Sequence, residues 1–89
     1  MKAMITVIGK DQEGIIAGVS TELYKNNVNI LDISQTIIGG YFTMIMLVDM
    51  EKSKVSFTKL KEELVKKGEE LKVSIKIQHE DIFNSMHRI

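Results

Sequence analysis

The centre of the chain, Val28–Met50, reads VNILDISQTIIGGYFTMIMLVDM and places two apolar segments around the pair Gly39-Gly40. The first segment is rich in Ile, Leu and Thr, which favours a strand. The second, from Tyr41 onward, is apolar on both of its alternating faces, which is typical of a strand in the centre of a sheet. Two consecutive glycines suit a tight hairpin turn, which needs positive φ angles. The stretch therefore predicts an antiparallel β-hairpin.

The N-terminal flank of this hairpin carries a strand and a helix. Residues 2–9 place Ala3, Ile5 and Val7 on one face at a period of two, as a strand does. Apolar side chains then recur at helical spacing from Ile15 onward. Asn26-Asn27 is expected to end this helix, because Asn tolerates the left-handed conformation found at helix exits.

The C-terminal flank carries the same two elements in the reverse order, a helix and then a strand. A second helix is expected to begin near Ser53 or Ser56, either of which can cap it, and to end at Gly68. Residues 71–77 alternate as a strand with one polar face. Residues 80–89 can form a short amphipathic helix. Its apolar side carries Ile82, Phe83, Met86 and Ile89.

The order strand, helix, strand, strand, helix, strand predicts the α+β ferredoxin-like βαββαβ sandwich, an antiparallel four-stranded sheet with both helices on one face. We assign residues 1–79 to this domain and residues 80–89 to a tail helix of the same domain. The sheet face without helices would present large apolar side chains to water. We expect the tail to cover that face, either in its own subunit or in a partner's.

Composition and charge limit the function classes. The 89 residues include 12 basic and 12 acidic side chains and no cysteine. Zero net charge argues against a nucleic-acid or acidic-membrane binder, and the lack of cysteine excludes thiolate chemistry. No apolar run approaches the roughly 20 residues of a membrane span, and the N-terminus lacks the pattern of a signal peptide. These features predict a cytoplasmic protein.

Neither catalysis nor a metal or cofactor site is expected. A phosphate-handling enzyme of this fold class needs an arginine in the first strand–helix loop, whereas the single arginine is Arg88. His79 and His87 are both near the C-terminus, so no nucleophile–base pair is evident, and their spacing of eight residues does not suit a metal-binding pair. An RNA-recognition module needs aromatic side chains on its first and third strands, and the first strand has none.

The loop GKDQEG, Gly9–Gly14, joins the first strand to the first helix. Free backbone N–H groups and the positive end of the helix dipole converge there. The loop can therefore hold a ligand carboxylate, while Asp11 or a carbonyl group holds an ammonium group. The glycine spacing resembles half of a P-loop, but Ile15-Ile16 stands where a lysine and a hydroxyl residue would bind phosphate. The same glycines also suit a tight turn without a ligand.

The motif Asp11-x-x-Gly14-Ile15-x-Ala17, followed by NVNILDISQT at residues 27–36, resembles the ACT-domain family over essentially the whole chain. It is most similar to small stand-alone members and to the regulatory modules of the glycine cleavage system regulator and formyltetrahydrofolate deformylase. The resemblance implies a regulatory homodimer, paired through sheet edges, that binds an amino acid at the domain–domain interface. By position it implicates five residues: Asp11, Gly14, Ile15, Asn29 and Ile30.

One position departs from the family pattern and leaves two hypotheses open. The residue before the loop glycine is often Pro or Ser in the family and is Glu13 here, and its carboxylate opposes a carboxylate ligand. The chain is then either an amino-acid-binding regulatory homodimer, acting on a regulated protein partner, or a non-catalytic interaction module that has lost ligand binding. The two hypotheses give Asn29 different roles. It either bonds a ligand or only turns the chain into its strand.

Overall fold

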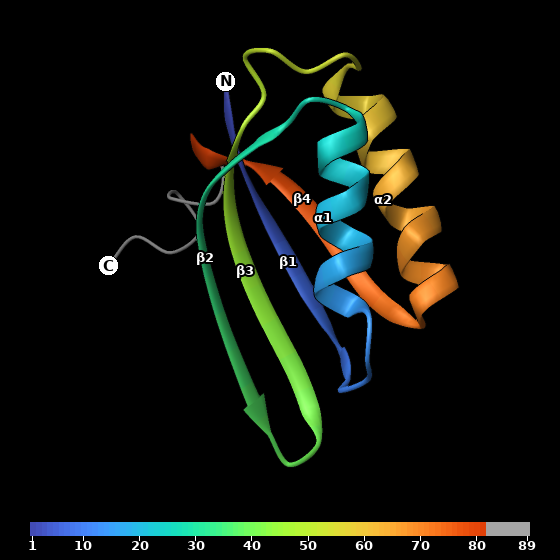
Figure 1. Ribbon diagram of the computed structural model, residues 1–89. Coiled ribbons are helices and arrows are strands. Elements are labelled where there is room, and N and C mark those ends of the chain that lie inside the picture. Colours follow the sequence, from blue (N-terminus) through green and yellow to red (C-terminus); the bar gives the residue numbers. More distant parts are fainter. Residues whose placement is uncertain (82–89) are drawn as a thin grey trace.

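The computed structural model describes residues 1–81 and shows the predicted βαββαβ order (Figure 1). The elements are β1 (Lys2–Lys10), α1 (Ile15–Lys25), β2 (Asn29–Ile38), β3 (Tyr41–Asp49), α2 (Phe57–Leu71) and β4 (Val73–His79). Of the predicted tail helix, Glu80 and Asp81 are helical, and the other residues lie outside the described range. Within residues 1–81, no helix is both long and apolar enough to cross a membrane.

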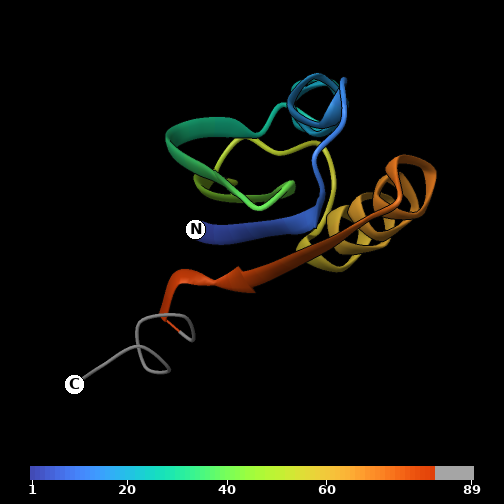
Figure 2. The same cartoon turned by 90° about the horizontal axis from the view of Figure 1, so that it is seen from below.

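The four strands form one antiparallel sheet in the order β2-β3-β1-β4. Both helices lie on the same face of this sheet, as the view along the strands in Figure 2 makes clear. The fold is therefore the ferredoxin-like sandwich that the order of the sequence segments predicted. The strand that is apolar on both faces, β3, lies between β1 and β2, which confirms its expected central position.

The core lies between the sheet and the helices. The strand register places one apolar row of β1 beside one apolar row of β3, for example Ile5 beside Met46. The core side chains of these two strands are Ala3, Ile5, Val7, Phe42, Met44, Met46 and Val48. Ile15, Val19 and Leu23 from α1, with Leu60 and Leu64 from α2, cover them. The other row of β3, which includes Ile45 and Leu47, therefore lies on the face away from the helices, called the open face below.

Turn and capping residues behave largely as the sequence predicted. Gly39 and Gly40 have φ angles of 57° and 82° at the β2–β3 turn. Asn27, with a φ of 59°, follows the end of α1. Ser56, rather than Ser53, caps α2, because its side-chain oxygen accepts the Lys59 N–H at 3.1 Å.

The prediction that Gly68 ends the second helix is wrong. The helix α2 continues to Leu71 and ends where Lys72 adopts a left-handed φ of 61°. Gly68 instead faces β4, where an added Cβ would lie 2.7 Å from the carbonyl oxygen of Val73. The glycine is needed for close approach between α2 and β4. Leu71, assigned to the last strand by its alternation, is consequently the last residue of the helix.

Candidate ligand-binding site

The loop between β1 and α1 presents backbone groups to solvent at the start of a helix. Gly14 occupies the N-cap position with a φ of 88°, and no side chain caps α1 there. The N–H groups of the first helical turn are thus available to an anion. The N–H of Asp11 donates to the carbonyl oxygen of Gly40 at 2.8 Å, and the Gln12 side-chain amide donates to the carbonyl oxygen of Leu71. These two bonds fix the loop to neighbouring elements.

The three predicted loop residues contribute different atoms. Asp11 is exposed and makes no ion pair within residues 1–81, so its carboxylate faces solvent. Glu13 is also exposed. The Ile15 side chain is 2% exposed and belongs to the core. Ile15 can therefore serve a ligand only through its backbone, whereas Gly14 provides the conformation that turns the loop into the helix.

The two predicted strand residues, Asn29 and Ile30, lie at the start of β2. Asn29 lies on the rim of a cleft of about 490 Å³ that the sequence did not indicate. The cleft is lined by Tyr24, Asn27, Val28, Asn29, Asp49, Glu51 and Lys52. Its walls are braced, because the Asn27 amide donates to the Lys52 carbonyl oxygen at 2.9 Å and the Asp49 carboxylate accepts the Glu51 N–H at 3.0 Å. Two segments that are distant along the chain, residues 24–29 and 49–52, meet here, so no local sequence pattern predicts the cleft.

Within one chain, the structure does not bring the two halves of the predicted site together. Asn29 pairs with Asp49, which pairs with Lys2 at the start of β1. Asp11 instead follows Lys10 at the far end of β1. The length of this strand separates the two groups by about 26 Å. The predicted site is thus divided into two candidate half-sites, with Asp11, Gly14 and Ile15 at one end of the sheet and Asn29 and Ile30 at the opposite end.

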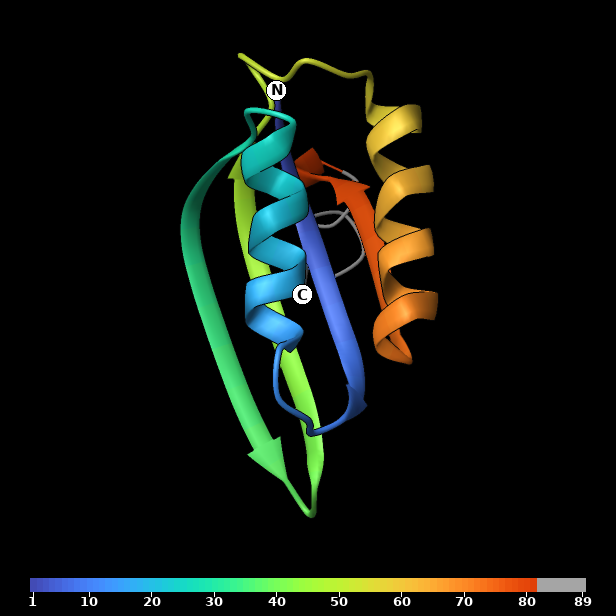
Figure 3. The same ribbon diagram turned by 45° about the vertical axis from the view of Figure 1, so that its right-hand side comes forward.

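The strand β2 is an unpaired and unusually apolar edge of the sheet. All ten of its residues are exposed, and α1 leaves it uncovered (Figure 3). Its exposed apolar side chains are Ile30, Leu31, Ile33, Ile37 and Ile38. The other edge strand, β4, buries Ile75 and Ile77 and exposes Ser74 and Lys76. Only the β2 edge therefore combines free backbone groups with apolar side chains, a combination that favours pairing with another strand.

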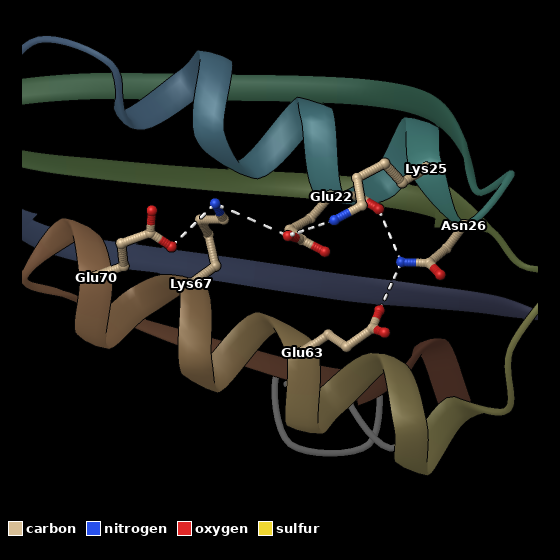
Figure 4. A network of polar contacts seen from close by, with 6 residues as sticks. All are labelled: Glu22, Lys25, Asn26, Glu63, Lys67 and Glu70. Atoms are coloured by element: carbon tan, nitrogen blue, oxygen red, sulfur yellow. Dashed lines mark hydrogen bonds and ion pairs between the residues drawn. The ribbon is translucent and has the colours of Figure 1, made fainter.

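A polar network joins the two helices (Figure 4). The Asn26 amide donates to the Glu22 carbonyl oxygen at 2.9 Å and to a Glu63 carboxylate oxygen at 2.7 Å. The Glu22 carboxylate, nearly buried, lies 3.4 Å from Lys25 Nζ and 3.8 Å from Lys67 Nζ. Because these groups satisfy one another, the network joins α1 to α2 rather than forming a second site.

The histidine that the structure describes has a packing role. The His79 ring stacks on the Phe57 ring, with centroids 4.5 Å apart and an angle of 24° between the planes. No group of three or more metal-ligating side chains occurs in the described part of the chain. His87 lies outside the described residues.

This fold, with an uncapped first helix and an open β2 edge, defines a small ferredoxin-like domain. A family model described as an ACT domain matches residues 2–78. The chain therefore belongs to the ACT-domain family. A UPF0237 protein of Clostridium acetobutylicum is 66% identical over 89 residues, which are the whole of both chains. That alignment includes the tail, which the family match does not reach.

Solved structures agree with this assignment. An ACT domain protein from Streptococcus pneumoniae has a TM-score of 0.82 and 48% identity, covering 93% of both chains. A protein assigned as a glycine cleavage system transcriptional repressor has a TM-score of 0.76 and 25% identity, covering 86% of this chain and 44% of that one. A formyltetrahydrofolate deformylase from Pseudomonas syringae has a TM-score of 0.80, covering 88% of this chain and 27% of that one, and at 22% identity shows the fold alone.

Proposed function

We propose that the protein is a regulatory homodimer that binds a small amino acid at its subunit interface. The observation that carries this proposal is the separation of the two half-sites at opposite ends of one sheet. A site made from both requires a second copy. The open edge of β2 is the surface through which that copy would pair.

Antiparallel pairing of β2 with the partner's β2 would join the half-sites. In an antiparallel pair related by a two-fold axis, the start of one strand lies beside the end of the other. The partner subunit's Asn29 would then lie beside Ile38 and the turn at Gly40. Because the Asp11 N–H is bonded to Gly40, the first loop of one chain would meet the first β2 residues of the other. One dimer would contain two such composite sites.

The exposed apolar side chains support the same pairing. Ile33 and Ile37 pair with Met46 and Phe42 of the core row, so they lie on the helix side of the sheet. They are nevertheless 43% and 57% exposed, and Ile16 on α1 is 39% exposed. A partner strand and helix would cover these side chains, which a monomer leaves in water. Their burial would stabilise the dimer by the hydrophobic effect.

The chemistry of the composite site suits a zwitterion. The uncapped N-terminus of α1 would take the ligand carboxylate, because backbone N–H groups and the helix dipole favour negative charge there. The Asp11 carboxylate would take the ammonium group, and the partner's Asn29 would bond the ligand across the interface. We assign no catalytic role to these residues, and we place the dimer in the cytoplasm.

Regulation would follow from linkage between ligand and assembly. A ligand held by both subunits stabilises the dimer geometry that completes the site, relative to any geometry that does not. Coupling free energies of this kind are typically about 1–3 kcal/mol. A protein partner that recognises one geometry would respond to the amino acid concentration.

The test is a thermal-denaturation screen of the purified protein against the twenty common amino acids. We expect a saturable rise in melting temperature with one or a few of them. Asn29→Ala and Gly14→Val should each abolish that rise, whereas Lys76→Ala on the opposite edge strand should retain it. A flat response to all twenty would refute the ligand-binding proposal.

Glu13 favours the second candidate, an interaction module that has lost its ligand. Its exposed carboxylate precedes Gly14 and opposes an anion at the helix N-terminus. This alternative predicts a dimer whose stability does not depend on any amino acid. The same screen, read together with the oligomeric state, distinguishes the two candidates.

A further inference from the structure

The open face of the sheet carries an apolar stripe along its two central strands. Met4 pairs with Leu47, and Thr6 pairs with Ile45, two residues further along. Ile8 continues the row and is 49% exposed, while Ile45 is 36% exposed. We call the four residues Met4, Ile8, Ile45 and Leu47 the central stripe. Neither helix covers it, because both lie on the other face (Figure 2).

Polar residues border the central stripe on both sides. On the β4 side, Gln78 pairs with Met4 and Lys76 pairs with Thr6. On the β2 side, Asp32 pairs with Leu47 and Ser34 pairs with Ile45. Beside the central stripe, the apolar surface is therefore two strands wide, and the neighbouring residues of both edge strands are polar. Ile38, at the far end of β2, is the apolar exception on this face.

These dimensions fit one short helix. Two strands about 4.8 Å apart, with their side chains, match the roughly 10 Å diameter of an α-helix. From Met4 to Ile8 the stripe extends for about 13 Å along β1. A helix of the eight residues 82–89 would be about 12 Å long. A second sheet would fit poorly, because face-to-face packing would also bury Asp32 and Lys76.

The chain leaves the sheet beside this stripe. The strand β4 ends at His79, whose ring is held on the helix side by its stack with Phe57. The preceding residue, Gln78, lies on the open face in the same row as Met4 and Leu47. The tail thus begins at one end of the stripe, and eight residues of the sequence follow Glu80 and Asp81.

We propose that residues 82–89 form a helix that lies along the central stripe of their own subunit. The spacing of Ile82, Phe83, Met86 and Ile89 places four apolar side chains on one side of such a helix. Running back from the end of β4, it would set Phe83 over the row of Met4 and Leu47. Met86 would lie over Ile45 and Ile89 over Ile8.

This tail contact would direct self-association. With the stripe covered, β2 is the remaining large apolar surface of the described chain, so copies pair edge to edge. Without the tail, two apolar surfaces compete, and association through the open face becomes available. The proposal concerns the tail and stripe only, and does not depend on amino-acid binding at the β2 interface.

Because the chain contains no cysteine, two engineered thiols can report this contact without background. The full-length double variant Ile45→Cys with Met86→Cys would be treated with a short thiol-specific cross-linker. The matched control joins Met86→Cys to Val65→Cys, since Val65 is 45% exposed on α2, away from the sheet. We expect the first pair to cross-link within one chain and the control pair to remain unlinked. Equal cross-linking of both pairs, links only between chains, or no link in the first pair would overturn the proposal.

Truncation after Asp81 provides a second measurement. The shortened chain should bind more of an apolar fluorescent dye than the full chain, and Ile45→Asp in the shortened chain should remove the added binding. An unchanged dye signal and melting temperature after truncation would equally overturn the proposal.

Discussion

Asp11 donates its backbone N–H to the carbonyl oxygen of Gly40 over 2.8 Å, and so fastens the loop after β1 to the turn after β2. Through this bond, the end of the edge strand β2 lies beside the loop of the candidate ligand site. Any partner strand that aligns antiparallel with β2 brings its own first residues to the end that carries Asp11. Pairing of the edge and completion of the site are therefore one event in the proposed dimer.

A charge placed on the β2 edge should separate the subunits. Ile37 is 57% exposed, so Ile37→Lys should leave the fold intact while opposing a second copy of the same strand, because each added ammonium group would be placed against the apolar side chains of the partner strand. Sedimentation velocity should show a shift towards monomer. The control, Ser74→Lys on the exposed side of β4, should sediment as the wild type does. Unchanged sedimentation of Ile37→Lys would show that β2 is not the interface.

Two helical glycines, Gly68 in α2 and Gly18 in α1, should respond differently to the same substitution. At Gly68 an added Cβ meets the backbone oxygen of Val73 at 2.7 Å, which cannot move away cheaply. Gly68→Ala should destabilise the fold by about 1–3 kcal/mol, although alanine alone favours a helix by about 1 kcal/mol. At Gly18 the Cβ meets only the end of the flexible Leu71 side chain at 2.8 Å, so Gly18→Ala should change stability by less than about 1 kcal/mol. Urea denaturation of both variants measures the difference, and equal effects would contradict this packing argument.

The helix-joining network should depend on Asn26 more than on its neighbour. Asn26→Ala removes two hydrogen bonds and leaves the carboxylate of Glu63 without its amide donor, which should lower the free energy of unfolding by about 1–3 kcal/mol. Asn27→Gly removes one exposed bond to Lys52 and keeps the positive φ accessible, so its effect should be a few tenths of a kcal/mol. Thermal denaturation measures both variants. A larger effect at Asn27 would contradict the role assigned to the network.

Replacing Glu13 should strengthen ligand binding. Glu13→Ser removes a carboxylate next to the site for the ligand carboxylate, and an interaction of up to about 1 kcal/mol corresponds to a gain of about fivefold in affinity. Calorimetric titration with the amino acid that gives the greatest thermal stabilisation measures this gain. Glu13→Gln should give a similar gain, because it also removes the charge. Weaker binding by both variants would show that Glu13 holds the ligand rather than opposing it.

The fold was predictable because the hydrophobic pattern of each segment and the order of the segments along the chain indicate the same architecture. Alternation in β1 and β3, helical spacing after Ile15, and Gly39-Gly40 between two strands leave few other arrangements. The end of α2 was not predictable in the same way, since Gly68 ends no helix and serves a contact with β4 that only the tertiary structure reveals. A glycine has the same sequence signature in both roles.

The residues of the candidate site stay a prediction that rests on the resemblance, and their arrangement in space was not predictable. Nothing local in the sequence shows that Asp11 and Asn29 lie at opposite ends of one sheet. The cleft beside Asn29 and the network around Asn26 were missed, because each forms between segments that are distant along the chain. Tertiary contacts of this kind leave no periodic signal.

Subunit complementation tests the shared site most directly. Gly14→Val damages the loop half-site and Asn29→Ala the strand half-site, so neither homodimer should bind the amino acid. If the two variants are unfolded together and refolded, half of the dimers are mixed, and each mixed dimer has one intact site and one with both defects. Equilibrium binding should then recover about a quarter of the wild-type number of sites at wild-type affinity. A refolded mixture that binds no more than either variant alone would contradict a site built from two chains.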